Sequence, residues 1–281
     1  MENPLLPTFL YKYLGSSLSP TDNRIPFLEV DRLIRFTQPT SFNDPFEALP
    51  LWSLDNIDDE TIEEIFVGLP CQNVPMTISQ REKLRKIKHA FSKEGIRTNP
   101  DRYKEMLSRI ARNSAVKNTG ILSLSALWDS GLMWAHYTNN EGICIGFDTK
   151  HDFFRNDLDN LVYEVEYPEV RPVAHVSILK GQGLAEILYK YKAKKWDYEE
   201  EYRLVRPLVS STKIVGTDTK KNPVHLFEVP IEAVAEVHLG PCCTKELRDR
   251  VIEWHSGNRH IGFFETVLSD KDYAISRNPL H

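Results

Sequence analysis

Short apolar and β-branched runs recur along the chain, most densely in its second half. Such runs, when turn-forming residues bound them, are typical of strands. The sequence therefore predicts strands at residues 8–13, 120–125, 142–147, 161–167, 201–206, 225–229, 234–239 and 261–267. The run at 142–147 is apolar almost throughout, so we expect it to be buried on both faces.

Apolar residues spaced three and four apart predict helices between these strands. Residues 58–69 begin with acidic side chains, which suit the positive end of the helix dipole. Residues 79–94 open on a capping-box pattern, and residues 100–113 follow an Asn-Pro start signal. Residues 183–194 and 244–255 show the same spacing. The predicted fold class is therefore α+β, with mixed or antiparallel sheets.

No internal repeat or Gly/Pro-rich linker divides the 281 residues, and 41% hydrophobic content is enough for a large core. We therefore predict one α+β domain over residues 1–281, with a helical insertion at 79–118. The insertion is basic, because residues 81–120 carry 12 Lys and Arg against 4 Asp and Glu. Its charge indicates either a solvated helical face or a surface for a nucleic-acid or protein acceptor.

The net charge of −5 argues against tight, indiscriminate binding to nucleic acid. The four cysteines lack a CxxC pair and are too sparse for a disulfide framework, so we expect reduced thiols. No apolar run approaches the ~18 residues of a membrane span, and the first residues lack the pattern of a signal peptide. We therefore expect a cytoplasmic protein that does not bind membranes.

Residues 42–47, Phe-Asn-Asp-Pro-Phe-Glu, form the first motif that suggests chemistry. Asn43 and Asp44 before a proline are strong turn formers, so this segment is consistent with a turn that Phe42 and Phe46 pin in place. The density of carboxylate, amide and aromatic groups is equally consistent with one wall of a binding site.

Residues 127–137 form the second motif and predict a short helix that begins near Asp129 or Ser130. Its aromatic face is consistent with core packing. The alternative is an aromatic wall on which a flat ring stacks, with Trp134 and Tyr137 in contact and His136 or Tyr137 bonded to a polar group of the ligand.

Residues 196–203 form the third motif, Trp-Asp-Tyr-Glu-Glu-Glu-Tyr-Arg. In an extended chain, residues two apart share a face, so Glu199, Glu201 and Arg203 are expected to converge. Two close carboxylates raise one pKa and the guanidinium opposes this, an arrangement suited to proton transfer. An exposed, charged strand start is the alternative.

Several well-known site motifs are absent from the sequence. It contains no P-loop, no GxGxxG, no GxSxG and no HExxH, and no His and Cys stand at zinc spacing. We therefore predict no metal site. Ser123, in an alternating strand with Ser125, is a further candidate for a ligand-facing hydroxyl.

Seven segments carry a family resemblance, and they are residues 10–13, 35–39, 42–47, 122–125, 133–137, 142–147 and 196–203. Their order and spacing resemble the bacterial domain-of-unknown-function 2971 family across residues 9–240. Some members resemble components of abortive-infection loci that defend against phage. The resemblance thus implies a growth-arresting effector or its partner.

The chain is also similar to ADP-ribosyltransferases, α/β folds that bind NAD between two sheets. The late Glu-x-Glu of that family maps onto Glu199 and Glu201, the middle strand onto residues 122–125 and the early strand onto residues 10–13. Where those enzymes usually carry His or Arg in the early strand, this chain has Lys12.

This similarity implies roles for individual residues. Glu201 would stabilise the oxocarbenium-like state, Glu199 would activate an acceptor or water, and Arg203 would complete the catalytic group. The implied contacts to NAD, a dinucleotide, are Tyr11, Lys12, Tyr13, Arg35, Phe42, Asn43, Asp44, Ser123, Trp134, His136 and Tyr137.

Two other functions fit the same motifs. The first is a metal-dependent nuclease or phosphoesterase in which Asp44, Glu47, Glu199 and Glu201 gather Mg²⁺ beside Lys12. The second is a non-enzymatic defence sensor or antitoxin whose aromatic motifs bind a protein partner. Fully buried motif side chains without an open pocket would favour that second alternative.

Overall fold

The computed structural model describes residues 6–15, 18, 24–58, 61, 93–155, 160–180 and 183–280. The described chain is an α+β fold, as predicted, and its main element is a mixed sheet of eight strands in the order β13-β12-β11-β5-β1-β4-β8-β6. These strands are β1 Phe9–Leu14, β4 Thr119–Ser125, β5 Ile143–Asp148, β6 Leu161–Glu164, β8 Glu201–Pro207, β11 Val234–Leu239, β12 Gly262–Leu268 and β13 Ile275–Pro279.

Most neighbours in this sheet are antiparallel, and β11 and β12 are the parallel pair. Parallel strands need a crossover connection, which α7 (Lys245–Ser256) supplies. Thr244 caps this helix by accepting a hydrogen bond from the backbone N–H of Leu247. The helix buries Leu247 and Val251 against the sheet, as its apolar spacing requires.

The sheet is nearly split between β1 and β4. These strands share a single registered pair, Tyr11 with Ser125, whereas β1 pairs with β5 along its whole length. The ammonium group of Lys12 crosses the split and donates to the backbone oxygen of Ser123 at 2.9 Å. Side chains from both halves of the sheet therefore meet at one opening.

Two smaller sheets complete the described β structure. One has the order β2-β10-β9, and the other pairs β3 with β7 in parallel. Their strands are β2 Leu33–Phe36, β3 Leu51–Ser53, β7 Val173–His175, β9 Lys213–Thr217 and β10 Pro223–Glu228.

The eight predicted strands are all present, with shifted ends. The strand predicted at 161–167 ends at Glu164 in the structure. Beyond it, Glu166 forms an isolated parallel bridge with Tyr191. Strands β2, β3, β7, β9 and β13 were not predicted. A π-helix, Pro26–Asp31, was not predicted either.

The described α-helices besides α7 are α3 Lys93–Thr98, α4 Pro100–Asn118, α5 Gly131–Thr138 and α6 Leu184–Tyr189. Helix α4 confirms the prediction at 100–113, and α5 begins after Ser130, one of the two predicted caps. The prediction at 183–194 is too long, because the backbone bonds of Glu166 to Lys190 and Lys192 draw the chain away from α6. Most of the helices predicted at 58–69 and 79–94 lies outside the described residues.

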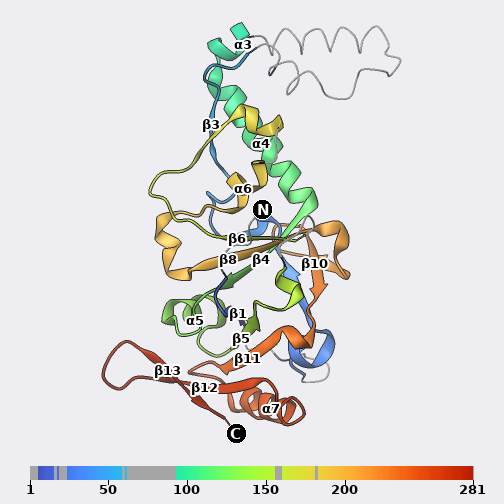
Figure 1. Cartoon of the computed structure of the whole chain (residues 1–281), viewed down its shortest axis with the longest axis vertical. Coiled ribbons are helices and arrows are strands. Elements are labelled where there is room, and N and C mark those ends of the chain that lie inside the picture. The colour runs from blue at the N-terminus through green and yellow to red at the C-terminus, as the bar shows by residue number, and fades with distance from the viewer. Residues whose placement is uncertain are drawn as a thin grey trace.

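Apolar side chains on the two faces of the sheet form separate clusters. Helix α5 packs Trp134 and Met133 against Tyr11, Tyr13 and the buried Cys144. Figure 1 shows α4 extending towards one end of the molecule, and α7 with β12 and β13 at the other. Within the described residues, no helix has the length and apolarity needed to cross a lipid bilayer.

Candidate functional site

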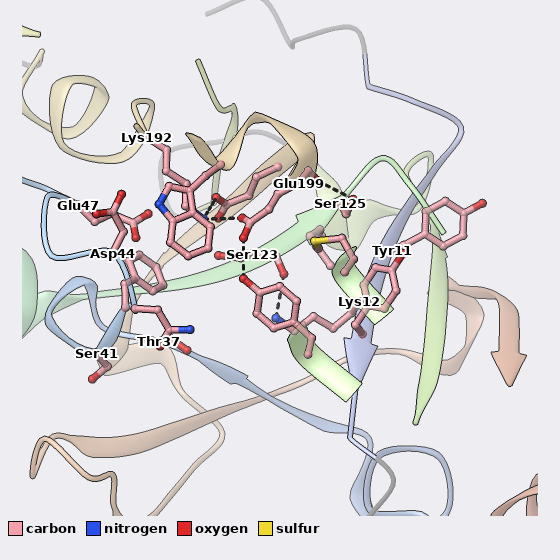
Figure 2. Close-up of a pocket in the computed structure, with 18 of the residues that line it drawn as sticks. Tyr11, Lys12, Thr37, Ser41, Asp44, Glu47, Ser123, Ser125, Lys192 and Glu199 are labelled. Carbon is pink, nitrogen blue, oxygen red and sulfur yellow. Dashed lines mark hydrogen bonds and ion pairs between the residues drawn. The ribbon is translucent and has the colours of Figure 1, made fainter. Parts of the chain in front are cut away.

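A cavity of about 240 Å³ opens where β1 and β4 separate (Figure 2). Strands β1, β4 and β8, helix α5 and the loops around residues 37–47 and 192–199 all contribute to its wall. In Figure 2, Asp44 and Glu47 lie on one side of the opening and Tyr11 and Ser125 on the other. The lining comprises Tyr11, Lys12, Tyr13, Arg35, Thr37, Ser41, Phe42, Asn43, Asp44, Glu47, Ser123, Leu124, Ser125, Met133, Tyr137, Lys192, Trp196, Glu199 and Glu201.

The three sequence motifs thus contribute to one cavity. Eleven of the residues proposed from sequence line it, and these are Tyr11, Lys12, Tyr13, Arg35, Phe42, Asn43, Asp44, Ser123, Tyr137, Glu199 and Glu201. They come from segments that are far apart in the chain. The geometry brings these groups together, while their chemical roles stay predictions.

Trp134 does not belong to this group. Its side chain has no exposed surface, its ring packs edge-on against Tyr13 at 5.0 Å, and its indole N–H donates to the backbone oxygen of Trp128 at 2.8 Å. Because α5 lies directly on β1, the tryptophan faces the sheet rather than the cavity. The expectation that it stacks on a ligand is therefore wrong.

His136 also lies outside the cavity lining. It is exposed on α5, and its Nδ1 atom is 2.9 Å from the hydroxyl of Tyr198. Its ring is 6.4 Å from that of Trp196 at the rim. The expected contact between His136 and a ligand inside the cavity is not supported by this placement.

Arg203 is completely buried behind the cavity and has no surface in it. Its guanidinium donates to Glu201 Oε1 at 2.9 Å, to Glu47, and to the backbone oxygen of Tyr189 at 2.7 Å. Arg203 therefore positions two carboxylates rather than contacting a bound molecule. The expected direct catalytic role of Arg203 does not agree with this buried position.

A lysine that sequence reasoning missed holds the acidic pair together. Lys192 Nζ is 2.5 Å from Glu199 Oε2 and 3.2 Å from Glu201 Oε2, and all three side chains are almost fully buried. Its ammonium also lies 4.8 Å from the centre of the Trp196 ring. Because one cation binds both carboxylates, the two acids lie close together at the cavity wall.

The route by which the acids converge differs from the expected one. Glu199 ends a 3-10 helix, Lys194–Glu199, and strand β8 starts only at Glu201. Between them Glu200 takes a left-handed conformation, with φ of 40°, and its side chain is exposed. The pair therefore depends on a turn and on Lys192, because the two residues do not share a continuous strand.

Burial dominates the proton affinities of these groups. Burial raises the pKa of Glu201 above its usual value, while the charge of Lys192 acts against this and that of Glu199 adds to it. Burial lowers the pKa of Lys192, but Glu201 and Glu199 outweigh it, so the net pKa is raised. Glu201 therefore holds its proton to a higher pH than a free glutamate does, and above that pH it is an ionised carboxylate beside the ammonium of Lys192.

The hydroxyl of Tyr137 donates to Glu199 Oε1 at 2.8 Å. Burial, then the charge of Glu199, raises the pKa of this phenol above its usual range. Burial also lowers the pKa of Lys12, the cation on the opposite strand. No ion pair within the described residues includes Lys12, although the charges of Glu201 and Glu199 oppose the effect of burial on its pKa.

The loop of the first motif is fixed from outside by Asp218. Its Oδ2 atom accepts from Arg35 at 2.6 Å and from Ser41 at 2.5 Å. Hydrogen bonds, led by that of Ser41, lower the pKa of Asp218 below its usual range. Asp218 thus holds one cationic wall residue and the loop that carries Asp44.

Two polar atoms of the wall are buried without a hydrogen-bond partner in the described structure, Asp44 Oδ2 and Arg35 Nε. The other oxygen of Asp44 accepts from the backbone N–H of Phe46 at 2.9 Å. An unmet buried acceptor is unfavourable, and a ligand donor such as a sugar hydroxyl would satisfy it.

The carboxylates are not arranged as a cation site. In the described part of the chain, no three His, Cys, Asp or Glu side chains are grouped so as to hold a metal ion. Glu47 is bound by Arg203, and Glu199 and Glu201 are bound by Lys192. Of the four acids named for the alternative of a metal-dependent nuclease, three are therefore each paired with a cationic side chain.

Residues 133–204 match the model of the family described as a protein of unknown function (DUF2971). The resemblance to this family is thereby confirmed for the segment that contains Tyr137, Lys192, Glu199 and Glu201. No curated protein and no solved structure matches the chain. The family description carries no activity, so function has to be argued from the site.

Proposed function

We propose that the cavity binds the nicotinamide-ribose end of NAD. In this proposal the protein cleaves the bond between nicotinamide and ribose, as an ADP-ribosyltransferase-like enzyme or an NAD glycohydrolase. The observation that carries this proposal is the buried pair of Glu199 and Glu201 on the ammonium of Lys192, at the wall of an open cavity. Such a pair supplies both an ionised carboxylate and a proton acceptor.

Cleavage of the nicotinamide–ribose bond leaves its electron pair on nicotinamide, which departs neutral, and develops positive charge on the ribose. Glu201 is the group that stabilises this charge in the proposal. An acceptor hydroxyl or water then forms a bond to the ribose carbon and transfers its proton to Glu199. Tyr137 and Lys192 orient Glu199 for that step through their hydrogen bonds.

The rest of the wall suits the polar parts of a nucleotide. Asp44 offers an unmet acceptor to a ribose hydroxyl, and Asn43 lines the cavity beside it. Lys12 and Arg35 supply positive charge for a phosphate. Phe42 and Trp196 take the stacking role that Trp134, buried in the core, does not have.

The near-split sheet supports the proposed likeness to ADP-ribosyltransferases, because that class binds NAD between two sheets. The cavity lies at the split, and its lining includes residues of both β1 and β4. A partner-binding antitoxin would have fully buried motif side chains and no open pocket, whereas here motif side chains line an open cavity with polar walls. Consumption of NAD would arrest growth, in agreement with the proposed role in phage defence.

The acceptor in a transfer reaction belongs to the same proposal. The basic insertion at 79–118 is its proposed contact, and the described helix α4 presents Arg102 and Arg109 to solvent. A protein or nucleic-acid acceptor that binds there would raise nicotinamide release above the rate with water alone.

The test is to incubate the purified protein with NAD and to follow nicotinamide release, with and without cell extract or oligonucleotide. EDTA is present to remove divalent cations. A parallel reaction with Mg²⁺ and labelled nucleic acid measures cleavage. We expect nicotinamide release in EDTA that Glu199→Gln reduces and Glu232→Gln, an exposed control, does not. Nucleic-acid cleavage without nicotinamide release would contradict the proposal.

A further inference from the structure

A second cavity, of about 220 Å³, lies directly beyond Lys192, which lines both spaces. The partition between them is the segment at residues 46–48. Glu47 faces the first cavity, whereas its neighbours Phe46 and Ala48 line the second.

The contacts and backbone conformations of residues 46–48 hold this partition in place. The backbone N–H of Phe46 is bound by Asp44, and the carboxylate of Glu47 is bound by Arg203. Ala48 takes a left-handed conformation with φ of 54°, which the surrounding contacts must enforce in a residue with a Cβ. The two cavities are therefore neighbouring compartments with a defined wall.

The second cavity is mostly apolar. Prolines and aliphatic side chains dominate its lining, which also includes Phe46, a residue that is 57% exposed. The Arg171 guanidinium lies 5.9 Å from the Phe46 ring centre and is held by the backbone oxygens of Leu49 and Pro50. Aromatic faces and guanidinium planes are the surfaces on which nucleic-acid bases stack.

The volume of the first cavity suggests that one ligand occupies both cavities. Pockets that enclose drug-sized molecules occupy about 300–1,000 Å³, and the first cavity is smaller than this range. It therefore has room for one end of a dinucleotide, and the other end must lie outside it. The second cavity offers an apolar slot for a flat ring on the far side of Lys192.

We infer that the second cavity binds the adenine ring of the dinucleotide, stacked between Phe46 and the apolar wall beside Arg171. This inference rests on the proposed function, because it takes NAD as the ligand of the first cavity. The diphosphate then passes over the segment at residues 46–48, with Lys12 and Arg35 on the side of the first cavity and Arg171 on the side of the second.

Calorimetric titration of AMP, ADP-ribose and nicotinamide mononucleotide tests this assignment. The variants are Phe46→Ala and Arg171→Met, and the matched control is Tyr273→Ala, which truncates a fully exposed aromatic outside the lining of both cavities. Because Phe46 is largely exposed, its truncation should leave the fold intact. Loss of one base-stacking contact predicts binding of AMP and ADP-ribose about tenfold weaker, with nicotinamide mononucleotide unchanged.

The other outcomes separate the inference from the proposed function. Equal affinity of Phe46→Ala and the unaltered protein for AMP and ADP-ribose overturns the adenine site, even if NAD is cleaved. Binding of AMP that depends on Phe46, without binding of NAD or its mononucleotide, retains the second cavity and overturns the proposed function. Failure of every nucleotide to bind the unaltered protein overturns both.

Discussion

The phenol of Tyr137 donates a hydrogen bond of 2.8 Å to Glu199, although the two residues are 62 positions apart in the sequence. This contact joins α5 to the end of the 3-10 helix before β8, and so joins two of the three motifs. The carboxylate of Glu199 is held from both sides, by the phenol and by the ammonium of Lys192. Its orientation towards the cavity is therefore well determined.

Tyr137→Phe removes this hydrogen bond without changing the shape of the ring. We expect nicotinamide release to fall about tenfold, because Glu199 loses one of the groups that orient it. The free energy of unfolding should fall by only about 1 kcal/mol, as for one hydrogen bond. Tyr198→Phe is the control, since its hydroxyl contacts His136 outside the cavity. Equal rates for both variants would exclude Tyr137 from the reaction.

Glu201 should make stability depend on pH. Its pKa is raised in the folded protein, so the folded state holds this proton to a higher pH than the unfolded chain does. The resulting stabilisation is complete below the ordinary pKa of 4.5 and is lost as the pH rises through the folded value. Glutamine does not ionise, so Glu201→Gln should lack this decline.

Urea unfolding of both proteins between about pH 4 and pH 8 measures the effect. The free energy of unfolding of Glu201→Gln, relative to that of the unaltered protein, should increase as the pH rises. Parallel curves over the whole range would show that the folded pKa of Glu201 is not raised.

Trp134 and Trp196 should respond in opposite ways to replacement by leucine. Trp134 is fully buried, so Trp134→Leu should lower the free energy of unfolding by about 3 kcal/mol and leave the Kd of NAD unchanged. Trp196 lines the cavity, so Trp196→Leu should weaken NAD binding with a smaller loss of stability. Urea unfolding and calorimetry measure the two quantities. If NAD binding were weaker in Trp134→Leu and unchanged in Trp196→Leu, the ring of Trp134 would contact the ligand.

The turn between the two acids gives a prediction about the backbone. Glu200 has a φ of 40°, a region where a side chain costs about 1 kcal/mol or more relative to glycine. Glu200→Gly should therefore raise the free energy of unfolding slightly, by about 0.5–1 kcal/mol, and preserve the positions of Glu199 and Glu201. Glu200→Val should lower both stability and nicotinamide release. A glycine variant less stable than the valine variant would contradict the observed turn.

The sequence pattern identified seven of the eight strands of the large sheet, because those strands are apolar runs with few competing signals. Residues 143–148, for example, are buried in five of six positions. The shorter strands escaped prediction for a physical reason. Strands such as β9, with mostly exposed side chains, and β3, with three residues, take their structure from pairing partners distant in sequence rather than from a local pattern.

The same limit applies to the candidate site. The motifs were visible as clusters of polar and aromatic residues, and most of their residues line the cavity. Lys192 was not visible, because Lys190, Lys194 and Lys195 surround it in the sequence and only tertiary contacts distinguish it. One signal existed, since a buried pair of carboxylates requires a neighbouring cation. The motif itself offered Arg203 for that role, but Arg203 pairs with Glu201 and Glu47, and the cation bound to Glu199 is Lys192.

The central claim is that Glu201 stabilises the transition state for cleavage of NAD in this cavity. Its most direct test compares Glu201→Gln with the unaltered protein in single-turnover nicotinamide release and in the Kd for NAD. We predict a rate at least about 100-fold lower with a Kd that changes less than about threefold, because the lost charge acts mainly in the transition state. An unchanged rate of nicotinamide release in Glu201→Gln would contradict the claim.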